Sequence, residues 1–210
     1  PARQEIFFPQ KETFTCEEGY ATDSQADGVK DFEIECQDDG TQTSPLSCLP
    51  VECGHVPSHD HATWDESKIF VYLEKAKVKC NEGYSLDQTM SPAAKWYLLS
   101  CESDGTYEET KTCKNVKCGA PPEVQHSTRA DDVLFYLDKV EYTLDRGYTL
   151  NQQPDGPNTF EIECKSDATF SATKEPKPVT CNAAPARNHA VTSNAEYTFQ
   201  QKALYTCLNG

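Results

Sequence analysis

The stretch Cys80-Asn81-Glu82-Gly83-Tyr84 decides the fold, because its pattern recurs along the chain at an almost constant interval. Cys16 is likewise followed by Glu-Glu-Gly-Tyr, Leu144 by Asp-Arg-Gly-Tyr and Cys207 by Leu-Asn-Gly. The steps between these four positions are 64, 64 and 63 residues. Self-similarity at a fixed period of this size is typical of tandem modules, each of which is one small structural unit.

The residues around the repeated position have the pattern of two β-strands. An aromatic residue stands eight positions before it, a lysine five before and an apolar residue two before; the lysines are Lys11, Lys75, Lys139 and Lys202. A second alternation of apolar and polar residues leads into the next cysteine, over 32–36, 97–101 and 160–164. Such alternation predicts half-buried strands, and no helical period occurs. We therefore predict an all-β fold, with the first strand running from the aromatic residue to the repeated position.

The cysteines are more consistent with disulfides than with zinc. The chain has 11 cysteines and only 37% hydrophobic residues, too few for one large core. Small modules of this kind need covalent support, because a domain of about 60 residues buries little apolar surface. No Cys-x-x-Cys pair occurs, and a zinc site of scattered cysteines is a poor match. Oxidised cysteines predict a protein of the secretory pathway, secreted or held at the cell surface.

The order of cysteines, prolines and glycines resembles the sushi module, also called the complement control protein module. A proline follows the first cysteine of a copy by four positions, and a small residue follows the third by four; these residues are Pro57, Pro122, Pro185, Gly40, Gly105 and Ala168. The family's usual tryptophan is replaced by Gln42, Tyr107 and Phe170, so the copies are divergent. The resemblance implies small β-modules, each stapled by disulfides, in an extended rod.

On this resemblance the chain divides into four modules. We expect module 1 at 1–48, module 2 at 53–113, module 3 at 118–176 and module 4 at 181–210, and keep these names below. Modules 1 and 4 lack part of the pattern, so we expect the natural protein to extend in both directions. The linkers Leu-Pro-Val-Glu, Lys-Asn-Val-Lys and Lys-Pro-Val-Thr have four residues each, which leaves little room for free rotation.

The resemblance also implies a disulfide pairing, first cysteine to third and second to fourth. The implied bonds are Cys16–Cys48, Cys53–Cys101, Cys80–Cys113 and Cys118–Cys164. Module 3 has Leu144 and Pro176 at its second and fourth cysteine positions, so one whole bond is absent there. We therefore expect module 3 to be less stable than module 2. Cys36, Cys181 and Cys207 are expected to pair with cysteines outside this sequence.

No group of residues predicts an enzyme or a cofactor. His55, His59, Asp60 and His61 are the one cluster of catalytic or metal-ligating types. His59 and His61 could share a strand face and bind a metal, but no third ligand is fixed by the sequence. We favour the alternative that these residues are part of a polar surface loop.

The net charge of −15 restricts the class of partner. Module 1 alone has three basic and eleven acidic residues. Such a surface repels heparin-like polyanions, nucleic acid and anionic lipid, and no segment is apolar enough to span a membrane. The main hypothesis is an extracellular rod for protein–protein recognition or adhesion, for which a basic protein is the most suitable partner. The alternative is a structural repeat protein of a coat, matrix or appendage that assembles laterally with sister chains.

Overall fold

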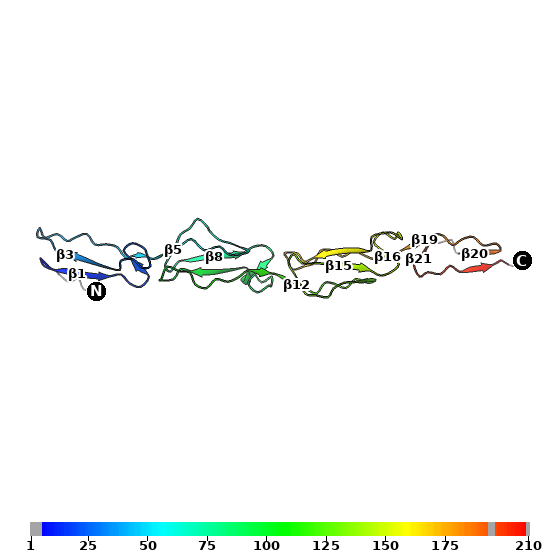
Figure 1. The fold of residues 1–210 in the computed structure, drawn as a ribbon, viewed down its shortest axis with the longest axis horizontal. Helices are drawn as coiled ribbons and strands as arrows, with labels where there is room; N and C mark the ends of the chain where they lie inside the picture. The colour runs from blue at the N-terminus through cyan, green and yellow to red at the C-terminus, as the bar shows by residue number, and fades with distance from the viewer. Residues whose placement is uncertain (1–5, 193–195, 209–210) are drawn as a thin grey trace. The chain divides into compact units, whose positions relative to one another are not determined.

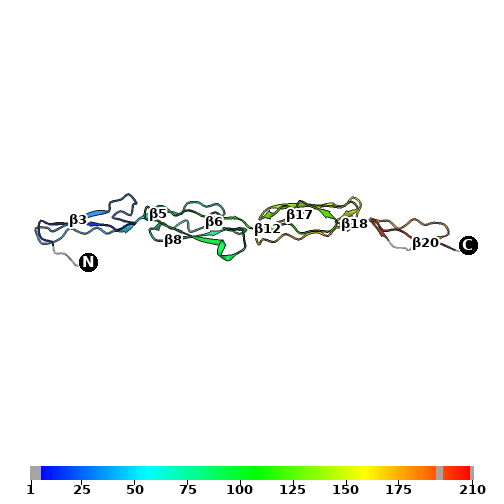
Figure 2. The same cartoon turned by 90° about the horizontal axis from the view of Figure 1, so that it is seen from below.

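The structure is a computed structural model that describes residues 6–192 and 196–208. The chain forms two compact units, Pro1–Lys114 and Asn115–Gly210, and each is described separately. Residues 1–5, 193–195 and 209–210, which the predictions assigned to modules 1 and 4, lie outside the described residues. Figure 1 and, turned by 90°, Figure 2 show strands joined by loops in both units.

Short strands and one 3₁₀ turn make up the first unit. They are β1 (Lys11–Thr15), β2 (Tyr20–Ala21), β3 (Asp31–Glu35), β4 (Leu49–Pro50), β5 (Glu52–Gly54), β6 (Ala62–Thr63), β7 (Phe70–Val71), β8 (Lys75–Cys80), β9 (Tyr84–Ser85), η1 (Pro92–Lys95) and β10 (Trp96–Ser100). The pairs β1–β3, β2–β4 and β5–β7 are antiparallel, and β8 lies between β10 and β6 in a three-stranded sheet. β11 (Lys114–Asn115) lies at the boundary between the units.

The second unit repeats this arrangement. Its strands are β12 (Lys117–Gly119), β13 (Ser127–Thr128), β14 (Leu134–Phe135), β15 (Lys139–Leu144), β16 (Tyr148–Thr149), β17 (Thr159–Glu163), β18 (Lys177–Pro178), β19 (Thr180–Cys181), β20 (Ala190–Thr192), β21 (Tyr197–Thr198) and β22 (Tyr205–Cys207). β15 lies between β13 and β17, and the remaining strands form two-stranded antiparallel sheets. The all-β prediction is confirmed; within the described ranges the only helical turn is η1, which begins at Pro92.

The alternation read from the sequence defines the cores of modules 2 and 3. Alternate residues of β8 and β15 are buried, beginning with Ala76 and Val140. The first core consists of Val56, Phe70, Ala76, Val78, Tyr97 and Leu99, and the second of Leu134, Val140, Tyr142, Leu144, Phe160, Ile162 and Cys164. Each large side chain buried in this way contributes about 1.5–3 kcal/mol. With so few such residues per module, the disulfides remain important for stability.

The predicted first strand is interrupted by a turn. Tyr72 lies in that turn, between β7 and β8, rather than in a continuous strand. Leu73 has a φ of 70°, and the Glu74 carboxylate accepts a hydrogen bond of 3.2 Å from the amide of Val71. The left-handed residue and this carboxylate reverse the chain, so the aromatic residue of the repeat leaves the sheet. The turn after β14 is built in the same way.

Candidate functional site

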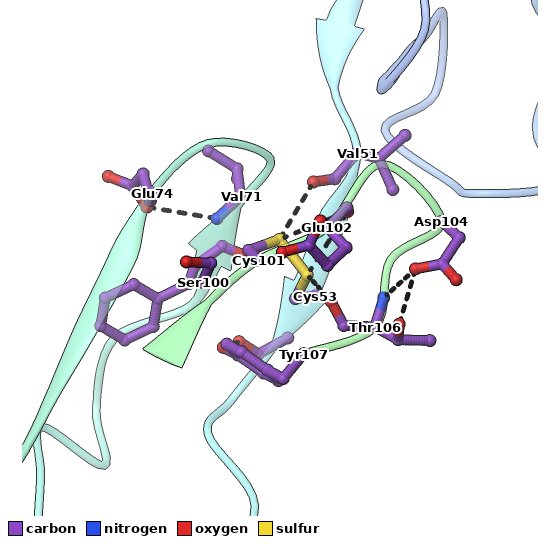
Figure 3. The surroundings of a disulfide bond; sticks show 12 residues. Val51, Cys53, Val71, Glu74, Ser100, Cys101, Glu102, Asp104, Thr106 and Tyr107 are labelled. Carbon is purple, nitrogen blue, oxygen red and sulfur yellow. Dashed lines mark hydrogen bonds between the residues drawn. A yellow bond between two sulfur atoms is a disulfide. The ribbon is translucent and has the colours of Figure 1, made fainter. Parts of the chain in front are cut away.

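Four disulfides fasten the β-segments at their ends. The structure has the bonds Cys16–Cys48, Cys53–Cys101, Cys80–Cys113 and Cys118–Cys164, with Cα–Cα distances of 5.5–5.8 Å. These are the same pairs that the sushi resemblance implies. Figure 3 shows Cys53–Cys101, next to which the Tyr107 hydroxyl donates a 2.9 Å hydrogen bond to the carbonyl of Gly54. Tyr107, which takes the place of the family's tryptophan, is therefore a packed and hydrogen-bonded residue.

A tight acidic turn follows this bond and recurs in the other copies. In Figure 3 the Asp104 carboxylate accepts hydrogen bonds from the amide and the hydroxyl of Thr106, at 3.0 and 2.6 Å. The hydroxyl bond is the main reason that the pKa of Asp104 lies below its ordinary value. Asp39 and Asp167 make the same turn. These carboxylates are thus used locally to fix loops, in keeping with the absence of a metal-binding group of three among the described residues.

The linker between modules 1 and 2 is an ordered contact. Val51, which has 0% exposure, donates its amide to the carbonyl of Gly19 at 2.9 Å and accepts the amide of Tyr72 at 2.8 Å. The Tyr72 ring covers Gly19 so closely that a Cβ there would lie 2.2 Å from the ring. Tyr20 meets the same ring edge-on, at 5.9 Å between centroids. One valine and one aromatic residue therefore connect the two modules through backbone and side-chain contacts.

The linker between modules 3 and 4 has the same construction. Val179 donates to the carbonyl of Gly147 at 2.9 Å and accepts the amide of Phe199 at 2.8 Å. A Cβ at Gly147 would lie 2.4 Å from the Phe199 ring, which Tyr148 meets edge-on at 6.1 Å. The repeated Gly-Tyr pair and the aromatic residue eight positions before the next copy are thus junction residues. Sequence analysis placed the aromatic residue in a strand; its constant spacing from Gly-Tyr was the signal for a junction.

The positions of the absent disulfide in module 3 match a bonded pair in module 1. Tyr148 pairs with Pro178 in β16–β18, as Tyr20 pairs with Pro50 in β2–β4. Counting back along both strands places Leu144 and Pro176 where Cys16 and Cys48 are bonded. Leu144 is buried in the module core. The assignment of both positions to a lost bond remains a prediction that this register supports.

The remaining predicted site residues form no metal-binding group of three in the part of the chain that the structure describes. Cys36 is half-buried, whereas Cys181 and Cys207 are exposed, and their pairing outside this sequence remains a prediction. The His59 ring lies edge-on to Trp64, and burial lowers the pKa of His59. His61 stacks on Tyr84, with ring centroids 4.0 Å apart. Each imidazole therefore has its own aromatic contact.

The sushi-repeat family model matches residues 2–48. Over 202 residues, 94% of this chain, the chain is 29% identical to the rat sushi, von Willebrand factor type A, EGF and pentraxin domain-containing protein 1. The resemblance to the sushi family is confirmed. The chain is also 21% identical to human C4b-binding protein alpha chain, over 94% of this chain. It is 26% identical to bovine complement factor H, over 78% of this chain.

The sushi relatives are much longer than this chain. It spans 5% of the rat protein, 32% of human C4b-binding protein alpha chain and 13% of bovine factor H. Its disulfides and its relatives together indicate an extracellular protein-interaction module. Among the described residues, no helix has the length and apolar character needed to cross a membrane.

Proposed function

We propose that this chain is an extracellular or cell-surface recognition element, in which tandem sushi modules present their outer faces to protein partners. The observation that carries the proposal is the ordered linker. Val51 and Val179 each bond to the modules on both sides. A linker held in this way gives two neighbouring faces a defined spacing, so that both can meet one partner at a reduced entropic cost.

The surface chemistry supports recognition of proteins rather than catalysis. Large apolar side chains, including Leu73 and Leu137, are exposed on turns that hydrogen bonds hold in shape. The net charge of −15 favours basic partners over nucleic acid or polyanionic glycans. C4b-binding protein binds C4b, as its name says, and its alpha chain is similar to this chain along 94% of this chain's length.

A binary binding screen tests this proposal. The oxidised chain is immobilised and probed with a panel of purified extracellular proteins that includes the chain itself. The reduced and alkylated chain, which has lost its fold, serves as the control. We expect at least one partner that binds the oxidised chain only. A panel in which every signal persists on the unfolded control contradicts the proposal.

A second candidate function is lateral assembly into a coat, matrix or appendage. It is favoured by one observation, the opposite charge of matching sheet faces in modules 2 and 3, which is developed below. Size-exclusion chromatography with light scattering separates the two functions. A monomer or small oligomer supports recognition, whereas a polymer that grows with concentration supports a structural role.

A further inference from the structure

The outward face of the main strand pair in module 2 is basic and aromatic. Alternate residues of β8 point outward, and the residues paired with them on β10 share that face. We call these residues the lysine face; they are Lys75, Lys77, Lys79, Trp96, Leu98 and Ser100. Within the described residues, none of the three ammonium groups has a carboxylate within 4.0 Å. In the described part of the chain, these three positive charges therefore lie together without an ion pair of their own.

Apolar surface lies among these charges. Trp96 and Leu98 are 41% and 43% exposed although both are large and apolar. The ammonium of Lys77 lies 4.6 Å from the centroid of the Trp96 ring, a cation–π contact that fixes both side chains. An exposed, pre-positioned tryptophan has the character of an interface hot spot, because hot spots are enriched in Trp, Tyr and Arg.

The same six positions of module 3 have three glutamates, one lysine and two threonines, and are therefore acidic on balance. We call them the glutamate face; they are Lys139, Glu141, Thr143, Thr159, Glu161 and Glu163, paired across β15 and β17. Every member is exposed. Lys139 lies 3.9 Å from Glu161, and in the described part of the chain no further ion pair occurs on this face. The two faces thus have the same backbone framework and opposite charge.

We propose that the lysine face binds the glutamate face of a second copy of this chain. The contact rests on the lateral assembly proposed above as the second candidate function, and it names the two surfaces that would meet. Both surfaces are the outer side of an antiparallel pair with five paired positions, so they match in extent. The lysine face has a charge of +3, and the glutamate face has −2 once Lys139 is counted, so the two faces are complementary in charge. The threonines of the glutamate face leave uncharged surface opposite Trp96 and Leu98.

The charge of the whole chain determines how this contact depends on salt. Two copies with a net charge of −15 repel each other at long range. The Debye length is about 8 Å at physiological ionic strength, so that repulsion is screened while charges a few ångströms apart still attract. At about 1 M salt the Debye length is about 3 Å and the attraction weakens as well. We therefore expect association to be strongest at intermediate ionic strength.

Charge reversal of each face tests the contact. Sedimentation velocity is recorded for the full 210-residue chain with its free thiols alkylated. The acidic variant is Lys75→Glu/Lys77→Glu/Lys79→Glu, and the basic variant is Glu141→Lys/Glu161→Lys/Glu163→Lys. Each variant alone has two faces of like charge, so we expect its self-association constant to fall at least tenfold. Mixed in equal amounts, the two variants have complementary faces and form a mixed complex.

Matched variants separate this contact from general effects. Lys30→Glu/Lys114→Glu/Lys174→Glu changes the net charge equally at exposed lysines outside the face and is expected to associate like the unmodified chain. Trp96→Ala, which leaves every charge in place, is expected to weaken association about tenfold. Should the acidic variant fold poorly, Lys75→Gln/Lys77→Gln/Lys79→Gln replaces it. This variant removes the three positive charges without introducing repulsion, and it too is expected to associate more weakly than the unmodified chain.

Three results overturn the contact. They are an unmodified chain that stays monomeric at every salt concentration, a control triple variant that associates as poorly as the acidic variant, and a mixture that forms no complex. If a sulfated glycan or another panel protein occupies the lysine face while self-association is absent, the second copy is the wrong partner. The recognition function then survives, because the binding screen tests it separately.

Discussion

Modules 2 and 3 have equivalent strands in the same register, yet they differ at one end of the core and on one outer face. Module 2 closes its end with Cys80–Cys113, whereas module 3 has Leu144 and Pro176 at the matching positions. The outer face of β8 and β10 has three lysines and no carboxylate, whereas the outer face of β15 and β17 has three glutamates and one lysine. The core pattern is the same in both. The shared fold therefore depends on the buried positions, while covalent closure and surface charge vary independently of it.

Removal of the Cys80–Cys113 bond from module 2 should bring its stability close to that of module 3, which lacks the equivalent bond. Cys80→Ala with Cys113→Ala opens a loop that spans 33 positions of sequence. On the chain-entropy model we expect the free energy of unfolding of module 2 to fall by about 3–4 kcal/mol. Denaturant unfolding followed by the fluorescence of its two tryptophans measures this change. A fall below about 1 kcal/mol would show that the bond contributes little to the folded state.

In module 3, Leu144 should have the stabilising role that the bond has in module 2. It is buried with Tyr142 and Phe160 in the core. Leu144→Ala leaves a cavity, so we expect a loss of about 2–4 kcal/mol in unfolding free energy. Val133→Ala in the same module is the control, because Val133 is 45% exposed and its truncation should cost less than about 0.5 kcal/mol. Equal losses for both variants would contradict the role of Leu144.

A disulfide introduced at the matching positions of module 3 should raise its stability toward that of module 2. We expect Leu144→Cys with Pro176→Cys to form a disulfide, because their register matches Cys16 and Cys48. The loss of buried Leu144 offsets part of the entropic gain, which leaves a net stabilisation of about 1–2 kcal/mol. Non-reducing peptide mapping detects the new bond and the other four. A bond joining Cys36 to Cys48, or Cys80 to Cys101, would show the pairing rule to be wrong.

Some features of modules 2 and 3 could be predicted from the sequence, and others depend on contacts that the sequence does not show. Alternation in 75–80 and 139–144 predicted strands and cores, because burial of alternate side chains is a local property. The junction of Tyr72 with Gly19 could not be predicted from alternation, since it depends on a turn at Leu73 and on contact between distant segments. The sequence analysis noticed Lys75 and Lys139 but missed Lys77 and Lys79. The opposed charges emerge only when cross-strand partners are known.

A smaller effect, on the pH dependence of stability, is expected from His59 of module 2. Burial against Trp64 and Tyr97 lowers its pKa, so the unfolded chain binds the proton more readily than the folded chain. Stability from the neutral ring is fully present above the ordinary pKa of about 6.5 and is lost as the pH falls through the folded value. We expect His59→Phe to reduce the loss of stability of module 2 below pH 6.5. An identical pH profile for both proteins contradicts this.

Hydrogen exchange resolved by residue tests the central claim most directly. The claim is that module 3, which lacks one disulfide, opens locally more readily than module 2. The far end of its core is held by packing of Leu144 and neighbouring residues, with no bond like Cys80–Cys113. We expect amides near Tyr142 and Phe170 to exchange about tenfold faster than those near Val78 and Tyr107, through local opening. Equal or greater protection at Tyr142 and Phe170 would contradict the account and show that Leu144 fully replaces the bond.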